Sequence, residues 1–382
     1  MEDDVYKKSL KLHKEHHGKL ETFSKVKLDS KDALSLAYSP GVAEVSREIY
    51  RDSSLAREYT LKRNTVAIIS DGSAILGLGN LGALAAIPVM EGKAAILKEF
   101  ANVDAFPICL DTQDTEEIIK TILNIAPVFG AINLEDIAAP KCFEIETRLR
   151  SLLNIPVMHD DQWGAATVTL AGIINSLKLT QQNKEDVKIV LSGIGAAGVA
   201  TAQLLLSYGI KNIVYVDSKG VIYKDRNDLN KEKLELLAKS TAIARAGDLS
   251  SAIQGANIFI GLSKPGILTK DMIKSMASNP IIFALANPTP EIMPEDAKEA
   301  GAFIIATGRS DFPNQVNNSL VFPGAFRGML DAGIPQFKIK MFTAIAIALA
   351  NHVTSLSTEK ILPTMFDKGV VELVSDTISK YR

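Results

Sequence analysis

The first half of the chain alternates short apolar runs with longer segments of helical periodicity. Between residues 60 and 180, each apolar run is followed by a segment in which apolar positions recur at helical spacing. The apolar runs are 66–70, 106–110, 131–134 and 156–159, and the helical patterns cover 87–100, 115–125, 141–152 and 164–179. Strands and helices that alternate in this way predict a parallel sheet with helices on both faces.

A polar segment, 181–186, separates this part from a second strand–helix series. Its predicted strands are 187–192, 212–216, 257–262, 281–286 and 302–306, and two helical patterns follow at 338–353 and 365–380. We therefore predict an α/β protein with two domains, each built on a parallel, mostly doubly wound sheet. The expected divisions are a first domain over 1–162, a second domain over 163–340 and C-terminal helices over 341–382. One arrangement of these helices is to pack back on the first domain.

Composition and charge narrow the class of protein. Lys and Arg number 42 against 44 Asp and Glu, so the chain has no basic excess with which to bind nucleic acid. Its two cysteines can build neither a disulfide framework nor a cysteine-based zinc site. The charged N-terminus is unlike a secretory signal, and no apolar stretch is long enough to cross a membrane. We expect a cytoplasmic protein without membrane or nucleic-acid partners.

Acidic residues follow every strand of the first series. Asp71 and Asp111 follow the first two, and the pairs 135–136 and 160–161 follow the others. The carboxyl ends of parallel strands share one edge of a sheet, where ligands bind. We interpret Asp71 and Asp111 as turn or capping residues. Adjacent carboxylates repel each other, however, and a divalent cation relieves that cost, so the two pairs predict an oxygen-rich metal site.

A glycine-rich loop opens the second series. Gly193, Gly195 and Gly198, with Ala196 and Ala197 between the last two, follow a strand and begin a helix over 196–208. The first glycine permits a tight turn, the second lets the backbone approach a pyrophosphate, and the third lets helix and strand pack closely. The free N–H groups of the helix N-terminus favour phosphate. A Rossmann-type dinucleotide-binding domain is therefore predicted.

The chain resembles the malic enzyme family, in its small prokaryotic type, over nearly its whole length. The segments that carry the resemblance are LSLAYSPGVAEV, SDGSAILGLGNLG, EGKAAILKEF, INLEDIAAP, HDDQWGAATVTLAGI, ALANPTPEI and NNSLVFPG. The resemblance implies divalent-metal-dependent oxidative decarboxylation of L-malate to pyruvate and CO2 with reduction of NAD or NADP, together with decarboxylation of oxaloacetate. It also implies a homodimer.

Site residues follow from the resemblance one by one. Tyr38 matches the catalytic tyrosine, Lys93 the catalytic and substrate-binding lysine, and Asp160 a further active-site acid. Glu135, Asp136 and Asp161 match the ligands of Mg²⁺ or Mn²⁺. Asn287 and Asn318 match amides that contact malate or nicotinamide, although the residues alone do not choose between Asn317 and Asn318. Ala74 stands where the large form of the family has an arginine that grips malate, so the group that binds the distal carboxylate stays open. Trp163 is interpreted as packing at a helix start.

The chemistry of malate oxidation gives these residues roles. A base must take the hydroxyl proton, and Lys93 can do so if burial or positive charge lowers its pKa. A Lewis acid must draw charge from the carbonyl oxygen during decarboxylation, for which hard carboxylate ligands suit Mg²⁺ or Mn²⁺. A general acid must then protonate the enolate on carbon, and the Tyr38 hydroxyl can supply that proton.

The choice of cofactor depends on the end of the second Rossmann strand. Asp217 lies there, 24 residues after Gly193, where an acid accepts hydrogen bonds from the adenosine ribose and repels a 2′-phosphate. Ser218 and Lys219 follow at once and can bind phosphate. We expect NAD to be preferred, with measurable use of NADP.

Three alternatives stay open. One is a malolactic conversion of malate to lactate, and another is a metal-independent dehydrogenase of a different 2-hydroxy or 2-amino acid. The third is a silent nucleotide-binding regulator, which would keep the glycine loop but has no reason to keep Lys93, Tyr38 and the acid pairs together.

Overall fold

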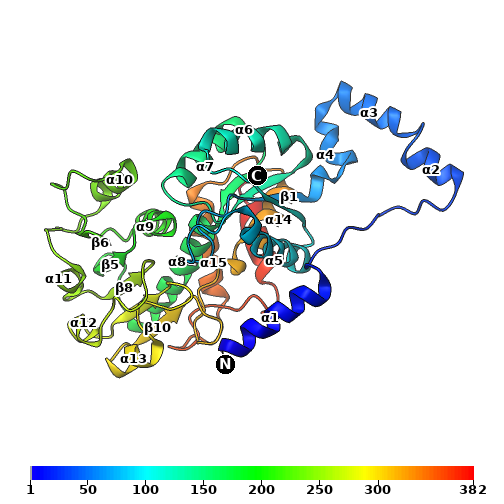
Figure 1. The fold of residues 1–382 in the computed structure, drawn as a ribbon. Coiled ribbons are helices and arrows are strands. Elements are labelled where there is room, and N and C mark those ends of the chain that lie inside the picture. The colour runs from blue at the N-terminus through cyan, green and yellow to red at the C-terminus, as the bar shows by residue number, and fades with distance from the viewer. Residues whose placement is uncertain (1) are drawn as a thin grey trace.

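A four-stranded parallel sheet forms the centre of the first half of the chain (Figure 1). The computed structural model describes residues 2–382. The sheet has the order β2-β1-β3-β4. Its strands are β1 (Thr65–Ser70), β2 (Asp104–Cys109), β3 (Ala131–Leu134) and β4 (Val157–His159). Every residue of β1, β3 and β4 is buried, which explains why these strands are apolar without alternation.

Helices cover both faces of this sheet, as the sequence predicts. They are α5 (Ala83–Ala101), α6 (Thr115–Ile125) and α7 (Lys141–Leu152). Ala67 and Ile69 of β1 share a core with apolar residues of α6 and α7. Val66 and Ile68 point the other way and share a core with residues of α5. Because successive strand residues face opposite sides, the strand is apolar on both.

The second sheet has six strands in the order β10-β9-β8-β5-β6-β7. They are β5 (Ile189–Ser192), β6 (Ile213–Asp217), β7 (Gly220–Val221), β8 (Ile258–Gly261), β9 (Ile281–Ala284) and β10 (Ile304–Thr307). The accompanying helices are α9 (Ala196–Tyr208), α10 (Lys231–Lys239), α11 (Leu249–Ile253), α12 (Lys270–Lys274) and α13 (Pro294–Glu299). The short antiparallel β7 was not expected: Gly220, at φ +102°, turns the chain back directly after β6.

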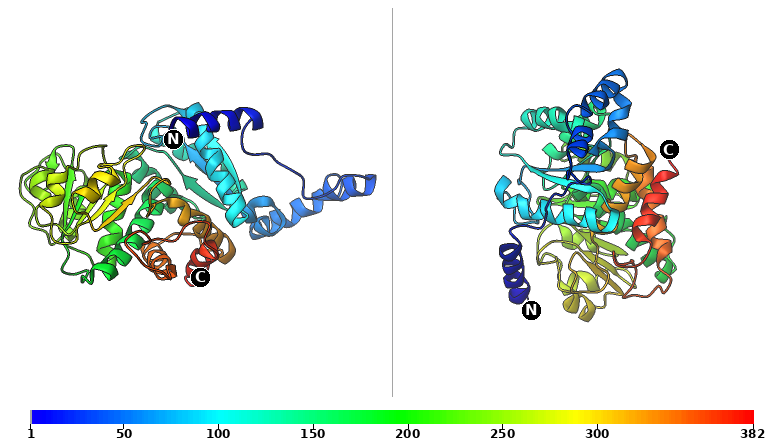
Figure 2. Two further views of the ribbon diagram at one scale, coloured as in Figure 1. Left: turned by 90° about the horizontal axis from the view of Figure 1, so that it is seen from below. Right: turned by 90° about the vertical axis from the view of Figure 1, so that its right-hand side faces the viewer.

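The long helix α8 (Asp160–Thr180) connects the two sheets and is buried over most of its length. It begins at the first acid of the 160–161 pair, four residues earlier than predicted, so both acids lie in its first turn. Three C-terminal helices complete the body: α14 (Phe322–Ala332), α15 (Ile339–His352) and α16 (Val370–Ser379). Helix α15 packs on α8, and α16 packs on α14 (Figure 2). Helix α14 also contacts α5. The expected domain divisions stay predictions.

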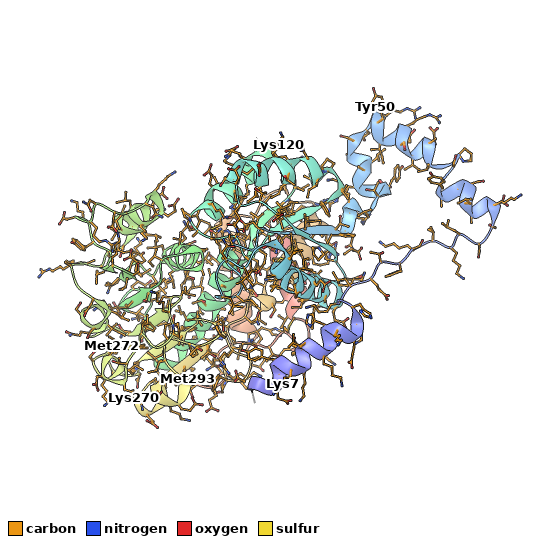
Figure 3. All side chains as sticks on the ribbon, in the orientation of Figure 1. Lys7, Tyr50, Lys120, Lys270, Met272 and Met293 are labelled. Carbon is orange, nitrogen blue, oxygen red and sulfur yellow. The ribbon has the colours of Figure 1, made fainter. Side chains whose placement is uncertain are left out.

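The N-terminal segment projects from this body. It contains α1 (Glu2–His16), α2 (Lys31–Ala37), α3 (Val42–Arg51) and α4 (Ala56–Tyr59). We call residues 31–59 the arm. In Figure 1 and in the left view of Figure 2, α2 and α3 lie away from both sheets, and neither helix has a buried residue. Tyr50, at the outer side of the arm in Figure 3, is 92% exposed.

Among the described residues, no helix is both long enough and apolar enough to cross a membrane.

Candidate active site

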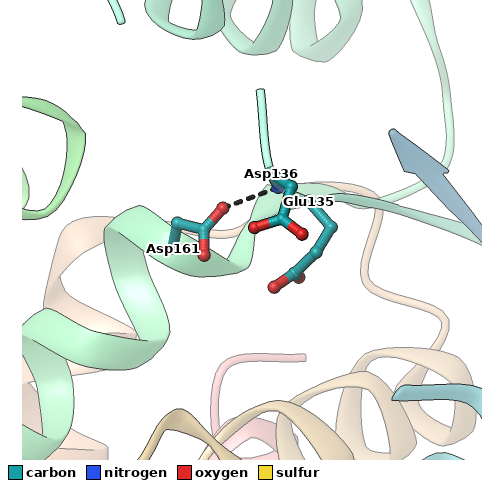
Figure 4. Close-up of side chains that lie close together, drawn as sticks. All are labelled: Glu135, Asp136 and Asp161. Carbon is teal, nitrogen blue, oxygen red and sulfur yellow. Dashed lines mark hydrogen bonds between the residues drawn. The ribbon is translucent and has the colours of Figure 1, made fainter. Parts of the chain in front are cut away.

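Three carboxylates meet at the carboxyl edge of the first sheet (Figure 4). Glu135 and Asp136 follow β3, and Asp161 lies in the first turn of α8. One oxygen from each lies within 4.8 Å of the others. The backbone N–H of Asp136 donates to Oδ2 of Asp161 over 2.8 Å, which joins the two segments. The parallel register of β3 and β4 places the ends of both strands side by side, so the predicted ligands converge.

The carboxylate cluster has the properties of a cation site. Burial, together with the negative charge of its neighbours, raises the pKa values of Glu135, Asp136 and Asp161 above their ordinary range. Oδ2 of Asp136 is buried and has no hydrogen-bond partner among the described residues. Buried oxygens with no donor are costly unless something positive satisfies them. Three hard oxygen donors fit Mg²⁺ or Mn²⁺, with room left for substrate and water.

Lys93 of α5 lies against this cluster and is 9% exposed. Its Nζ is 2.9 Å from Oε1 of Glu135 and also contacts Asp160. Burial alone would lower the pKa of Lys93, as the sequence led us to expect. The carboxylates of Asp160, Glu135 and Asp161 outweigh that effect and raise the pKa of Lys93. The cause is the number of acids that face one ammonium group.

Asp160 and Asn318 share the start of α8. A Cβ atom placed on Gly164 would lie 2.8 Å from Cβ of Asn318 and against Oδ1 of Asp160, so the absence of a side chain at Gly164 lets these two residues approach the helix. The side chain of Asn317 instead accepts from the N–H of Ser319 over 2.9 Å and caps a short 3₁₀ helix. Asn318 thus packs against the first turns of α8, whereas the Asn317 side chain is used in a local cap, and the assignment of Asn318 to the site stays a prediction.

Asn287 lies in the loop after the second sheet's strand β9, and its amide group lies against Gly308, where a Cβ atom would be 2.6 Å from Nδ2. A Cβ atom on Gly77 would lie 2.3 Å from the carbonyl oxygen of Asn287. The loop that contains Gly77 also touches the metal cluster, because the N–H of Ala74 donates to the carbonyl oxygen of Asp136 over 3.0 Å. Asn287 and the carboxylates are thus linked by one loop, between the two sheets.

The glycine loop has the geometry that a pyrophosphate needs. Gly193, at φ +99°, makes the tight turn. A Cβ atom on Gly198 would lie 1.9 Å from the carbonyl oxygen of Gly193, so helix and loop pack too closely for any side chain there. Around Gly195, by contrast, a Cβ atom would meet nothing within 4 Å. Its backbone is open to a ligand, directly before Ala196 and Ala197 at the start of α9.

Asp217 ends β6 as predicted, but its charge is already compensated. Arg226 donates to Oδ1 over 2.8 Å and to Oδ2 over 3.0 Å, and Lys233 donates to Oδ2 over 2.6 Å. Although burial alone would raise it, these hydrogen bonds hold the pKa of Asp217 below its ordinary value. Lys219 pairs with Asp228 instead, at 2.8 Å. The sequence did not indicate Arg226 or Lys233, because Arg226 lies within the irregular loop between β7 and α10, Lys233 follows that loop in α10, and the loop carries no recognisable motif.

Tyr38 is not brought to this cluster by its own chain. It caps the end of α2 in the arm, and its side chain is 70% exposed. The helices of the arm lie away from α8 and from the edge where the acids meet (Figures 1 and 2). One copy of the chain therefore lacks the predicted tyrosine at its site.

The remaining sequence interpretations concern single residues. Asp71 accepts from the N–H of Ser73 over 3.0 Å and pairs with Lys141, so it is a turn residue. Asp111 is exposed and lies outside the carboxylate cluster. Trp163 is 5% exposed and its ring stacks on Phe342 at 5.1 Å, which confirms packing at the helix start.

Comparison with known proteins agrees with this geometry. The family model described as "Malic enzyme, N-terminal domain" matches residues 17–150, and that described as "Malic enzyme, NAD binding domain" matches residues 163–378. A "Bifunctional malic/malolactic enzyme" of Bacillus subtilis is 52% identical over 97% of this chain and 92% of its own length. An "NADP-dependent malic enzyme" of Haemophilus influenzae is 46% identical over 95% of this chain and 50% of its own length.

Solved structures give the same result. The crystal structure of an NAD-dependent malic enzyme from Thermotoga maritima has a TM-score of 0.94 with this chain. It is 47% identical, and the match covers 97% of this chain and 98% of that one. With both family models matched in order, and with the carboxylate cluster and glycine loop in the corresponding parts of the fold, the chain belongs to the malic enzyme family.

Proposed function

We propose that this chain oxidises and decarboxylates L-malate to pyruvate and CO2, with reduction of NAD or NADP, at the carboxylate cluster beside Lys93. The observation that carries the proposal is the position of Lys93, whose Nζ lies 2.9 Å from Glu135 in a site that also contains Asp160 and Asp161. A hydride transfer alone needs no such set of acids, whereas decarboxylation of a β-keto acid gains from a cation that draws charge from the carbonyl oxygen.

The residues of the chain divide the work. Glu135, Asp136 and Asp161 would hold the cation, and the loop at Gly193–Gly198 with the start of α9 would hold the pyrophosphate. When bound, the cation supplies a Lewis acid and the nicotinamide supplies a hydride acceptor. Asn287 and Asn318 orient malate between them.

Lys93 takes the hydroxyl proton of malate, and Tyr38 gives a proton to carbon after CO2 is lost. A bound cation would offset the negative charge of Glu135 and Asp161, which is part of the charge that raises the pKa of Lys93. Lys93 can then lose its proton nearer to neutral pH, as a base requires. Asp160 stays beside the ammonium group and keeps the side chain in place.

Product analysis tests this function. Malate supplied with Mn²⁺ and NAD should give pyruvate and reduced cofactor in equal amounts. The bifunctional relative from Bacillus subtilis makes a malolactic conversion the one alternative with a specific observation behind it. Lactate formed from malate without net release of reduced cofactor would contradict the proposal and establish that alternative.

The chain acts as a homodimer in which the arm of one copy supplies Tyr38 to the other. Support comes from the arm itself, whose exposed apolar side chains have no covering partner in a single copy. Large exposed apolar residues of the arm include Leu34, Leu36, Val42, Val45, Tyr50 and Tyr59. Large apolar side chains exposed together on one segment are typical of a protein interface. A second copy is the simplest occupant, because it would bury this surface and bring a tyrosine to a site that lacks one.

Mixing two inactive variants tests this arrangement. A Tyr38→Phe chain and a Lys93→Ala chain should each have little activity, but refolded together they form hybrid dimers. If Tyr38 acts across the dimer, one of the two sites in each hybrid keeps both residues, and about a quarter of the wild-type activity should return on statistical mixing. Activity that stays at the level of the separate variants, in a preparation shown by mass spectrometry to contain hybrids, would place Tyr38 in its own chain's site.

The enzyme prefers NAD over NADP because Asp217 lies where the adenosine ribose binds. Lys233 determines how well NADP is used. The two oxygens of Asp217 already accept four N–H donors, so a ribose hydroxyl needs one of them to leave. Lys233 donates a single hydrogen bond from a flexible four-carbon side chain, whereas Arg226 contacts both oxygens, so Lys233 is the easier of the two to displace. When it swings from Asp217 toward a 2′-phosphate, it supplies the positive charge that NADP requires.

Lys233→Ala should lower kcat/KM for NADP by about tenfold and leave that for NAD within about twofold, since one charge-assisted contact is lost. Lys231→Ala is the matched control, because Lys231 lies on the same helix, is 83% exposed and pairs only loosely with Glu235 at 4.0 Å. Steady-state kinetics with each cofactor measure the ratio. If kcat/KM fell equally for both cofactors in the Lys233 variant, this lysine would not bind the 2′-phosphate of NADP.

A further inference from the structure

A buried glutamate outside the cluster holds the segment that carries two of its acids. Glu146 lies on α7 and is 4% exposed. Oε1 of its carboxylate accepts from the N–H of His159 over 3.1 Å and from Nε1 of Trp163 over 2.9 Å. Oε2 accepts from Nε2 of Gln162 over 3.3 Å and shares the indole N–H at 3.2 Å.

All three donors belong to the five residues 159–163, the junction between β4 and α8. Asp160 and Asp161 lie within the same five residues. The helix has no side chain of its own to cap it, because the N-cap residue His159 makes no such bond. Glu146 thus accepts, from a neighbouring helix, the backbone N–H of the N-cap residue and two side-chain donors of the first turn of α8.

The other side of this junction is also fixed. The ring of Trp163 stacks on Phe342 of α15, which in turn stacks on Phe337 at 5.4 Å. Arg150, one turn after Glu146 on α7, donates to the carbonyl oxygen of Phe337. The first turn of α8 is therefore clamped between α7 and the start of α15, and its rotation about the helix axis is set by the hydrogen bonds to Glu146.

We infer that Glu146 is a positioning residue, which directs Asp161 toward the cation and Asp160 toward Lys93 through the first turn of α8. The inference rests on the proposed metal-dependent function. Burying a carboxylate to this extent costs desolvation free energy. The three hydrogen-bond donors from residues 159–163 offset that cost. An amide in its place would keep one acceptor oxygen but turn its NH2 group toward a donor, so the segment would have to move.

Metal binding tests the inference without any turnover. Glu146→Gln should weaken Mn²⁺ binding by about tenfold or more, as changes behind a metal ligand commonly do. The concentration of free Mn²⁺ in a solution of the full-length protein is measured by electron paramagnetic resonance. NADH binding, followed by cofactor fluorescence, should stay within about twofold, since the glycine loop lies on the other sheet. Glu144→Gln is the control: the same change on the same helix, at a side chain that is 57% exposed.

A second variant keeps the test decisive if Glu146→Gln folds poorly. Trp163→Phe removes one donor but keeps the aromatic stack, and should weaken Mn²⁺ binding by about threefold. When Trp163→Phe is combined with Glu146→Gln, Mn²⁺ binding should be no weaker than in Glu146→Gln alone. Both changes act on the same hydrogen bond, between the Trp163 indole and the Glu146 carboxylate. Wild-type affinity for Mn²⁺ in Glu146→Gln, or in Trp163→Phe, overturns the inference, as does an equal loss of Mn²⁺ and NADH binding. A wild-type chain that binds no Mn²⁺ overturns the proposed metal site and this inference with it.

Discussion

Lys93→Ala should lose nearly all oxidation of malate, with kcat lower by a factor of about 10² to 10⁴, the contribution of a positioned general base. No other described residue at the cluster offers a nitrogen base in the same position: His159 is buried behind Asp161, and burial lowers its pKa to about 3. Steady-state kinetics at saturating Mn²⁺ measure the loss.

Two controls separate the loss of a base from the loss of structure. Lys98→Ala removes a lysine from the same helix, where it is 42% exposed and pairs with Asp104, and should leave kcat within about twofold. Small alkylamines added to Lys93→Ala should restore part of its activity, because they can occupy the vacated space and take the proton. A Lys93→Ala enzyme that retains more than a tenth of the wild-type kcat would remove Lys93 from this role.

Asp161→Ala should weaken Mn²⁺ binding by at least about 100-fold, more than the 10- to 100-fold typical of residues behind a ligand. Asp161 contributes an oxygen to the cluster and its Oδ2 also accepts from the N–H of Asp136, so its loss removes a ligand and frees a neighbour. Activity should fall in parallel and return only in part at high Mn²⁺ concentration.

The control for this variant is Asp111→Ala. Asp111 also follows a strand of the first sheet, but it is exposed and lies outside the carboxylate cluster. Its removal should leave Mn²⁺ affinity unchanged, and NADH affinity should be unaffected in both variants. Equal Mn²⁺ affinity in Asp161→Ala and Asp111→Ala would show that the cation binds elsewhere.

The sequence predicted most of what positions the site, because the acids and the glycines follow strands directly. Helices 115–125, 141–152 and 196–208 begin and end where the pattern placed them. Because β3 and β4 are parallel neighbours, their carboxyl ends lie side by side at one edge of the sheet. Glu135, Asp136 and Asp161, which follow those ends, are therefore brought together.

What the sequence could not predict depends on contacts between distant segments. The raised pKa of Lys93 follows from three acids that converge on it, whereas its own apolar surroundings indicate the opposite shift. The pairing of Asp217 with Arg226 and Lys233 depends on the path of a loop without periodicity. The exposed position of Tyr38 follows from helices whose apolar faces find no partner within one copy.

Oxidation of malate at this site, with the help of a divalent cation, can be followed in a single absorbance assay of reduced cofactor. The wild-type chain is supplied with L-malate and Mn²⁺, with NAD and NADP in separate runs, and each run is repeated with excess chelator. Reduced cofactor should form steadily, faster with NAD, and its formation should stop with chelator and resume when Mn²⁺ or Mg²⁺ is restored. Undiminished turnover in the presence of chelator would contradict the proposed dependence on a divalent cation.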